Sequence, residues 1–142
     1  MANKLLGYPC IMSVESATPG TYTPIAAVRD VGGPNIQTDA VDFTSRDTSW
    51  WKEFIAGLID GGEVEFDVLY DPDAATHGTT GIGLMALALA RTTKNWRITL
   101  SDATPTTWTF SGFIKNFKPK APMKDAFTAA ITVKVSGAIT VA

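Results

Sequence analysis

Residues 62–68 alternate between apolar and acidic side chains, and no other feature of the chain limits the possible folds as narrowly. The alternating residues are Gly62, Val64, Phe66, Val68 and Tyr70 on one side, and Glu63, Glu65 and Asp67 on the other. A period of two is typical of a β-strand with one buried and one solvated face. The segment therefore predicts a strand whose acidic side faces water or a polar channel.

A loop rich in large apolar side chains is predicted immediately before this strand. It combines Trp50, Trp51, Phe54 and Ile55 with Arg46, Asp47, Lys52 and Glu53. Large apolar side chains outside a regular strand need a cover, and that cover is often another protein chain. We therefore predict that the loop contacts a neighbouring chain. The alternative is that Trp51 and Phe54 fold back onto their own core.

Strands dominate the rest of the pattern. They are predicted over residues 10–15, 23–31, 38–44, 62–70, 95–101, 106–117 and 127–135. The short, turn-rich link between the strands at 95–101 and 106–117 predicts an antiparallel hairpin. One well-buried helix is predicted from Thr79 or Thr80 to Arg91, where Ala, Leu and Met favour helix. The chain is thus expected to be mainly β, an antiparallel sandwich or barrel of about seven strands with one flanking α-helix.

Length and charge limit the classes of function that the chain can have. A chain of 142 residues without an internal repeat or linker fits a single domain. The chain has 12 basic and 14 acidic residues. Its net charge of −2 argues against a protein that binds nucleic acid tightly. The basic cluster at residues 115–120 is best explained as a solvated strand end. Charged residues make up 18% of the chain, below the usual quarter, and this favours a protein that buries its outer surface in self-assembly. No signal peptide or membrane span is expected.

The sequence also lacks the residue combinations that catalysis requires. The single histidine, His77, has no Cys or Asp partner at metal-ligand spacing and is predicted to be an exposed loop residue. The single cysteine, Cys10, is expected to be a small buried hydrophobe. Glu63 and Glu65 resemble a carboxylate pair, but their spacing on the polar face of a strand is better explained by solvation or by facing a polar channel. We therefore predict a protein that is not an enzyme and has no cofactor or metal.

Several blocks of sequence resemble one known family. They are VDFTSRD at 41–47, WKEFIAGL at 51–58, DGGEV at 60–64, NWRI at 95–98, FSGFI at 110–114, KAP at 120–122 and the end of the closing strand at 135–137. In this order they resemble the major tail tube protein of long, non-contractile phage tails, the lambda-like group. The resemblance covers nearly the whole chain. It implies a single tail tube domain over residues 1–142, without the immunoglobulin-like domain that the lambda protein adds.

The resemblance implies a β-sandwich with a flanking helix whose hexameric rings stack into a tube. The tube would enclose a tape-measure protein, meet a tail terminator and a distal tail protein, and conduct DNA in transit without binding or membrane insertion. The location would be the virion tail, and the host cytoplasm during assembly. Alternatives are a terminator or distal tail protein, or a tube subunit of a gene transfer agent or phage-like bacteriocin. A carbohydrate-binding module stacking sugars on Trp50, Trp51, Trp96 or Trp108 is less consistent, because the last two lie on apolar strand faces.

Two site hypotheses follow. The residues proposed for contacts between subunits are Arg46, Asp47, Trp50, Trp51 and Phe54, since Trp and Arg concentrate binding energy at interfaces. The residues proposed to line the lumen are Glu63, Glu65 and Asp67, because a DNA conduit needs acidic or neutral polar walls. For these acidic residues a solvated outer strand face is the rival explanation.

Overall fold

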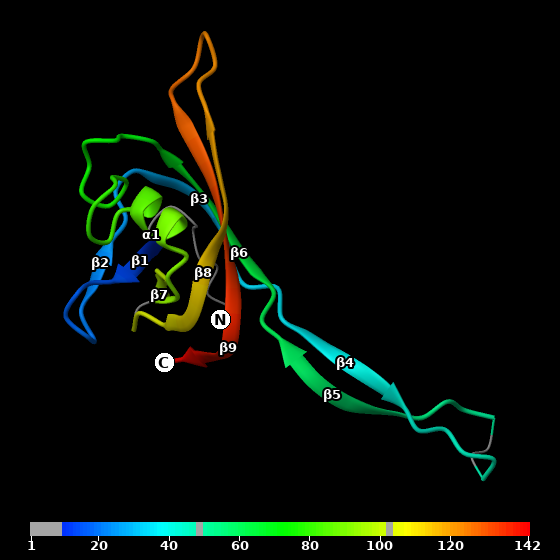
Figure 1. Cartoon of the computed structure of the whole chain (residues 1–142). Coiled ribbons are helices and arrows are strands. Elements are labelled where there is room, and N and C mark those ends of the chain that lie inside the picture. The colour runs from blue at the N-terminus through cyan, green and yellow to red at the C-terminus, as the bar shows by residue number, and fades with distance from the viewer. Residues whose placement is uncertain (1–9, 48–49, 102–103) are drawn as a thin grey trace.

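The computed structural model describes residues 10–47, 50–101 and 104–142, so residues 1–9 of the predicted domain lie outside the described part. Figure 1 shows the arrangement of its nine strands and one helix. In chain order these are β1 (Ile11–Glu15), β2 (Tyr22–Pro24), β3 (Val28–Gly32), β4 (Gln37–Asp42), β5 (Phe54–Asp60), β6 (Glu63–Leu69), α1 (Leu84–Ala90), β7 (Lys94–Thr99), β8 (Thr107–Lys120) and β9 (Thr128–Val141). The predicted mainly β class with one flanking helix is confirmed.

Seven strands form one curled antiparallel sheet. Its order is β2-β1-β7-β8-β9-β6-β3, so the two edge strands, β2 and β3, follow one another directly in the chain. In a flat sheet, strands at about 4.8 Å spacing would place these edges about 29 Å apart. The link from Pro24 to Val28 spans at most about 14 Å. The sheet must therefore curl until its edges nearly meet.

The concave side of the curled sheet holds the core. Val64, Phe66 and Val68 of β6 are 0%, 2% and 0% exposed, which confirms the alternation that predicted this strand. Trp96 of β7 is fully buried, and its Nε1 donates a hydrogen bond to the Gly112 carbonyl at 3.1 Å. The 95–101 and 106–117 segments form the predicted hairpin, as β7 and β8. Leu84 of α1 is also fully buried in this core.

The helix is shorter and less buried than predicted. It begins at Leu84, not at Thr79 or Thr80, because residues before it form turns and Gly81 has a φ of +61°. A side chain at Gly83 would lie 2.1 Å from the Gly78 carbonyl oxygen, so the chain can turn this tightly only without one. Leu84 and Leu87 are buried, whereas Leu89 is 72% exposed. The helix covers the sheet with one face only.

His77 is buried, so its prediction as an exposed loop residue was wrong. Its Nδ1 accepts a hydrogen bond from the Asp71 backbone N–H at 3.1 Å, and its Nε2 lies 2.6 Å from the Ala26 carbonyl oxygen. This arrangement requires the neutral ring with its proton on Nε2. The ring also stacks on Tyr70, with 6.1 Å between ring centroids. Paired in this way, the histidine joins the loop before α1 to the link between β2 and β3.

Three strand boundaries differ from the prediction. The segment at 23–31 is broken between β2 and β3, where Ala27 has a φ of +56° and the chain crosses between sheet edges. Residues 54–60, predicted to be part of a loop, form β5. The last strand continues to Val141, and Phe127, predicted to belong to its buried row, precedes it and is 44% exposed. No helix within the described residues is long and apolar enough to cross a membrane.

Candidate functional site

Strands β4 and β5 form a two-stranded hairpin that is separate from the main sheet and projects away from it (Figure 1). Every residue of both strands is exposed. The pairing runs from Gln37 opposite Asp60 at the base to Asp42 opposite Phe54 at the far end. We refer to residues 37–60 as the arm. An isolated two-stranded hairpin is marginal in water, so the arm depends on additional contacts.

The arm is apolar on both faces. Val41 lies opposite Ile55 on one face. The pairing shifts register between Thr38 and Ala40, so Ile59, opposite Thr38, lies on the other face. Phe54, opposite Asp42, lies on the same face as Ile59, and Leu58, in the shifted segment, is 83% exposed. A hairpin with one face in water would place polar residues on that face. Both faces of the arm are therefore built to be covered.

The five predicted interface residues all lie at the far end of the arm. Arg46 and Asp47 are exposed, Trp50 and Trp51 are 100% and 81% exposed, and Phe54 is 53% exposed. The alternative in which Trp51 and Phe54 pack onto their own core is contradicted by this exposure. Residues 48 and 49, within the predicted loop, lie outside the described part.

Hydrogen bonds hold the far end of the arm closed. The Thr44 hydroxyl accepts from the Glu53 N–H at 2.7 Å and donates to the Glu53 carbonyl at 3.2 Å. The Asp42 carboxylate accepts from the Thr44 N–H at 2.9 Å, and hydrogen bonds from Thr44 lower the pKa of that carboxyl. The tryptophans are thus presented on a locally ordered support.

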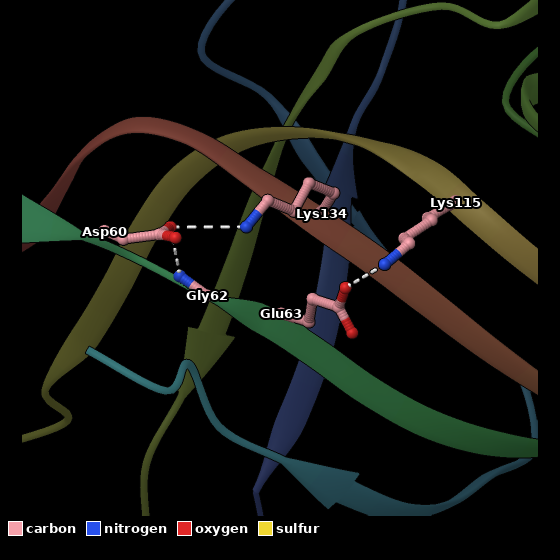
Figure 2. Close-up of polar contacts among 5 residues, drawn as sticks. All are labelled: Asp60, Gly62, Glu63, Lys115 and Lys134. Carbon is pink, nitrogen blue, oxygen red and sulfur yellow. Dashed lines mark hydrogen bonds and ion pairs between the residues drawn. The ribbon is translucent and has the colours of Figure 1, made fainter. Parts of the chain in front are cut away.

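The base of the arm is fixed to the main sheet. Asp60 accepts hydrogen bonds from the Gly62 N–H at 2.9 Å and from Lys134 of β9 at 3.2 Å (Figure 2). The Gly62 N–H and the Lys134 ammonium lower the pKa of the Asp60 carboxyl. Gly62 has a φ of +70°, and a side chain there would lie 2.3 Å from the Asn35 carbonyl oxygen. Only glycine fits this turn, at which the arm ends and the core strand begins.

The predicted lumen residues form one row on the convex face of the sheet, along β6. Glu63 and Asp67 are half-buried and Glu65 is exposed. Across β9 lies a row of cations on β8, made up of Lys115, Lys118 and Lys120. Glu63 forms an ion pair with Lys115 (Figure 2). The face is therefore mixed in charge, and its assignment to a lumen stays a prediction.

Sequence reasoning missed the apolar residues in the middle of the arm, among them Leu58 and Ile59. The signal was present in the run FIAGLI, whose lack of alternation is consistent with a strand covered on both faces. Trp96 is fully buried and Trp108 half-buried, so neither offers an open stacking surface for a sugar. Within residues 10–47, 50–101 and 104–142, no three His, Cys, Asp or Glu residues are placed to hold a metal ion.

Comparisons with known proteins agree with this architecture. The family model described as lambda phage tail tube protein matches residues 13–142. No curated protein matches the sequence. Among solved structures, the tail of an empty GTA particle with C6 symmetry superposes with a TM-score of 0.80 at 14% identity, over 96% of this chain and 98% of that one.

Two further structures have the same fold. The SPP1 tail tube superposes with a TM-score of 0.74 at 10% identity, over 97% of this chain and 78% of that one. The baseplate structure of the anti-feeding prophage superposes with a TM-score of 0.77 at 10% identity, over 100% of this chain and 97% of that one. At these identities the likeness concerns the fold.

Proposed function

The chain belongs to the lambda phage tail tube protein family, so it is a structural subunit of a tail tube, and we propose that its copies form stacked hexameric rings through the arm. The observation that carries this proposal is an exposed hairpin with apolar residues on both faces. In a ring and its stack, each subunit has neighbours beside it and along the axis. Two neighbours can therefore cover the two faces of one arm.

The residues at the far end of the arm are expected to contribute most to the free energy of association between subunits. Trp50 is fully exposed, and Arg46 lies in the same turn region. Trp and Arg dominate the binding energy of many interfaces when a partner removes them from water. A fully buried aromatic side chain removes about 150–250 Å² from water. Repeated around a ring, such contacts favour assembly strongly.

We further propose that the convex face with Glu63, Glu65 and Asp67 lines the lumen. Lys115 is paired with Glu63, and Lys134 with Asp60, so these cations are partly neutralised. A wall of compensated charges attracts phosphate less than free lysines would, so DNA can pass without being held. The proposed partners are other copies of the chain, a tape-measure protein, a tail terminator and a distal tail protein. The subunit would act without catalysis, in the virion tail, after assembly in the host cytoplasm.

Electron microscopy of the purified protein tests the proposal. Tubes with a regular axial repeat are expected. Assembly that stops at single rings would indicate a terminator or distal tail protein, and protein that stays monomeric at high concentration would contradict the proposal. Particles that carry host DNA, or no DNA, would place the subunit in a gene transfer agent or a phage-like bacteriocin.

A further inference from the structure

The β8–β9 ribbon ends in a protruding loop, and with Lys118 and Lys120 of β8 this end of the ribbon carries three lysines and one acidic residue. Residues 121–127 connect the two strands at the top of Figure 1, and Met123 among them is 99% exposed. Lys120 and Lys124 flank it, with Asp125 as the one acidic residue of the loop. A methionine side chain adapts its shape to irregular apolar surfaces, so a fully exposed one is suited to insertion into a partner.

An apolar groove of about 670 Å³ lies near the other end of the same ribbon, at the base of the arm. Its walls are formed by Ile36, Leu58 and Ile59 from the arm side and by Val135, Ala138 and Ile139 from β9. Asp39 and Asp60 provide the only charges in its lining among the described residues. The groove is thus apolar inside and carries two carboxylates, of which Asp60 pairs with Lys134. Its volume lies within the roughly 300–1,000 Å³ of pockets that enclose drug-sized molecules.

The loop of one molecule cannot fill its own groove. Thr128 at the loop and Ala138 at the groove are ten residues apart on β9, which corresponds to about 33 Å of extended strand. The two features nevertheless match in chemistry, since an exposed methionine beside Lys118, Lys120 and Lys124 meets an apolar groove with carboxylates in its lining. A shift of one molecule along the ribbon axis brings its loop toward the groove of the next molecule.

We propose that the Met123 loop of one subunit inserts into the arm-base groove of a second subunit and forms the axial contact between rings. This inference rests on the proposed assembly into rings and adds the surface that joins one ring to the next. The contact uses two different patches, so each bound subunit still presents a free loop at one end and a free groove at the other. Such head-to-tail contacts propagate without closing, as a tube requires.

Disulfide trapping tests the contact directly. In a Cys10→Ser background, Met123→Cys combined with Ala138→Cys is expected to give a ladder of covalent oligomers under mild oxidation. Because Met123 and Ala138 are exposed, both changes should leave the fold intact. A mixture of the two single-cysteine variants should stop at covalent dimers, since each variant then has only one reactive end. Met123→Cys with Leu89→Cys, an exposed position on the helix, is the control that should not form the ladder.

Two results would overturn the inference. One is a ladder from Trp50→Cys with Ala138→Cys in place of the Met123 pair, which would make the arm end the occupant of the groove. The other is normal tube formation by Met123→Glu, which places a carboxylate beside Asp39. We expect Met123→Glu to form rings but to need about tenfold or more protein for tubes, and Met123→Leu to form tubes normally. Failure of the unaltered protein to form rings would instead count against the proposed function.

Discussion

Strands β5 and β6 are neighbours in the chain, and only Gly61 and Gly62 separate them, yet they are built for different surroundings. In β6, apolar side chains at 0–2% exposure alternate with acidic ones, so the strand is completed within its own subunit. In β5, every residue is exposed and apolar residues occupy both faces. The difference shows that one turn divides the part of the chain that folds alone from the part that needs neighbours.

The largest expected effect comes from a charge placed in the subunit core. Ile131 of β9 is 1% exposed and lies opposite Phe66 of β6. Ile131→Asp should cost several kcal/mol of unfolding free energy, because a buried carboxylate without a partner must stay ionised at high cost or shift its pKa. We expect insoluble or unfolded protein. Ala130→Asp, the next residue on the exposed side, should fold, and equal melting temperatures for both would show that the faces are misassigned.

Matched phenylalanines compare the two strands directly. Phe66 is 2% exposed and Phe54 is 53% exposed. Phe66→Ala should lower the unfolding free energy of the monomer by about 3–5 kcal/mol, since it leaves a cavity in the core. Phe54→Ala should change monomer stability by about 0.5 kcal/mol or less and weaken assembly instead. Denaturant unfolding and sedimentation measure the two effects, and a large loss of monomer stability in Phe54→Ala would place β5 in the subunit core.

The far end of the arm should affect association and leave folding unchanged. Removing a large aromatic anchor from an interface centre costs about 2 kcal/mol or more of association free energy. Trp50→Ala with Arg46→Ala should therefore give a folded subunit with unchanged circular dichroism that forms tubes poorly. It should also fail to support tail formation beside an intact tape-measure protein. Tubes at the normal protein concentration would mean that the interface lies elsewhere on the arm.

The sequence predicted most accurately the strands that pack against other parts of the same chain. The β6 alternation and the β7–β8 hairpin could be read from period-two patterns, because one face packs inward and the other meets water. The β5 strand could not be predicted in this way, since both of its faces carry apolar residues. Its run FIAGLI therefore shows no alternation, and a single chain does not supply the contacts that would bury it. His77 was misjudged for a related reason: the Ala26 carbonyl that makes its burial tolerable is 51 residues away in sequence. The predicted interface residues lie together at the end of the arm and the acidic ones in one row on β6, and their roles stay predictions. The lysines beside the acidic row are brought there by a strand pairing that no local pattern shows.

Substitutions on the convex face should alter DNA transport and leave the stability of the subunit unchanged. Glu63, Glu65 and Asp67 lie on the polar side of β6, so changing all three to lysine should leave the core, rings and tubes intact. The change also leaves Lys115 without its Glu63 partner, and exposed pairs of this kind contribute only about 0–1 kcal/mol. DNA ejection should slow, most of all at low salt, because the three new lysines would join Lys115, Lys118, Lys120 and Lys134 on the same face. Glutamine and asparagine at the same positions provide the uncharged control, and normal ejection from tails with normal morphology would remove the lumen assignment.

The smallest expected effect concerns Asp60, at the turn between β5 and β6. The pKa of Asp60 is lowered in the folded protein by the Gly62 N–H and by Lys134, so its ionised form favours the native state. This contribution is fully present above the carboxyl's ordinary pKa and is lost as pH falls through the lowered one. Asp60→Asn should remove that part of the acid dependence of unfolding and leave stability near neutral pH slightly reduced. An unchanged acid limb in pH-dependent melting curves would mean that the base of the arm is held by its backbone turn at Gly62 and not by this carboxylate.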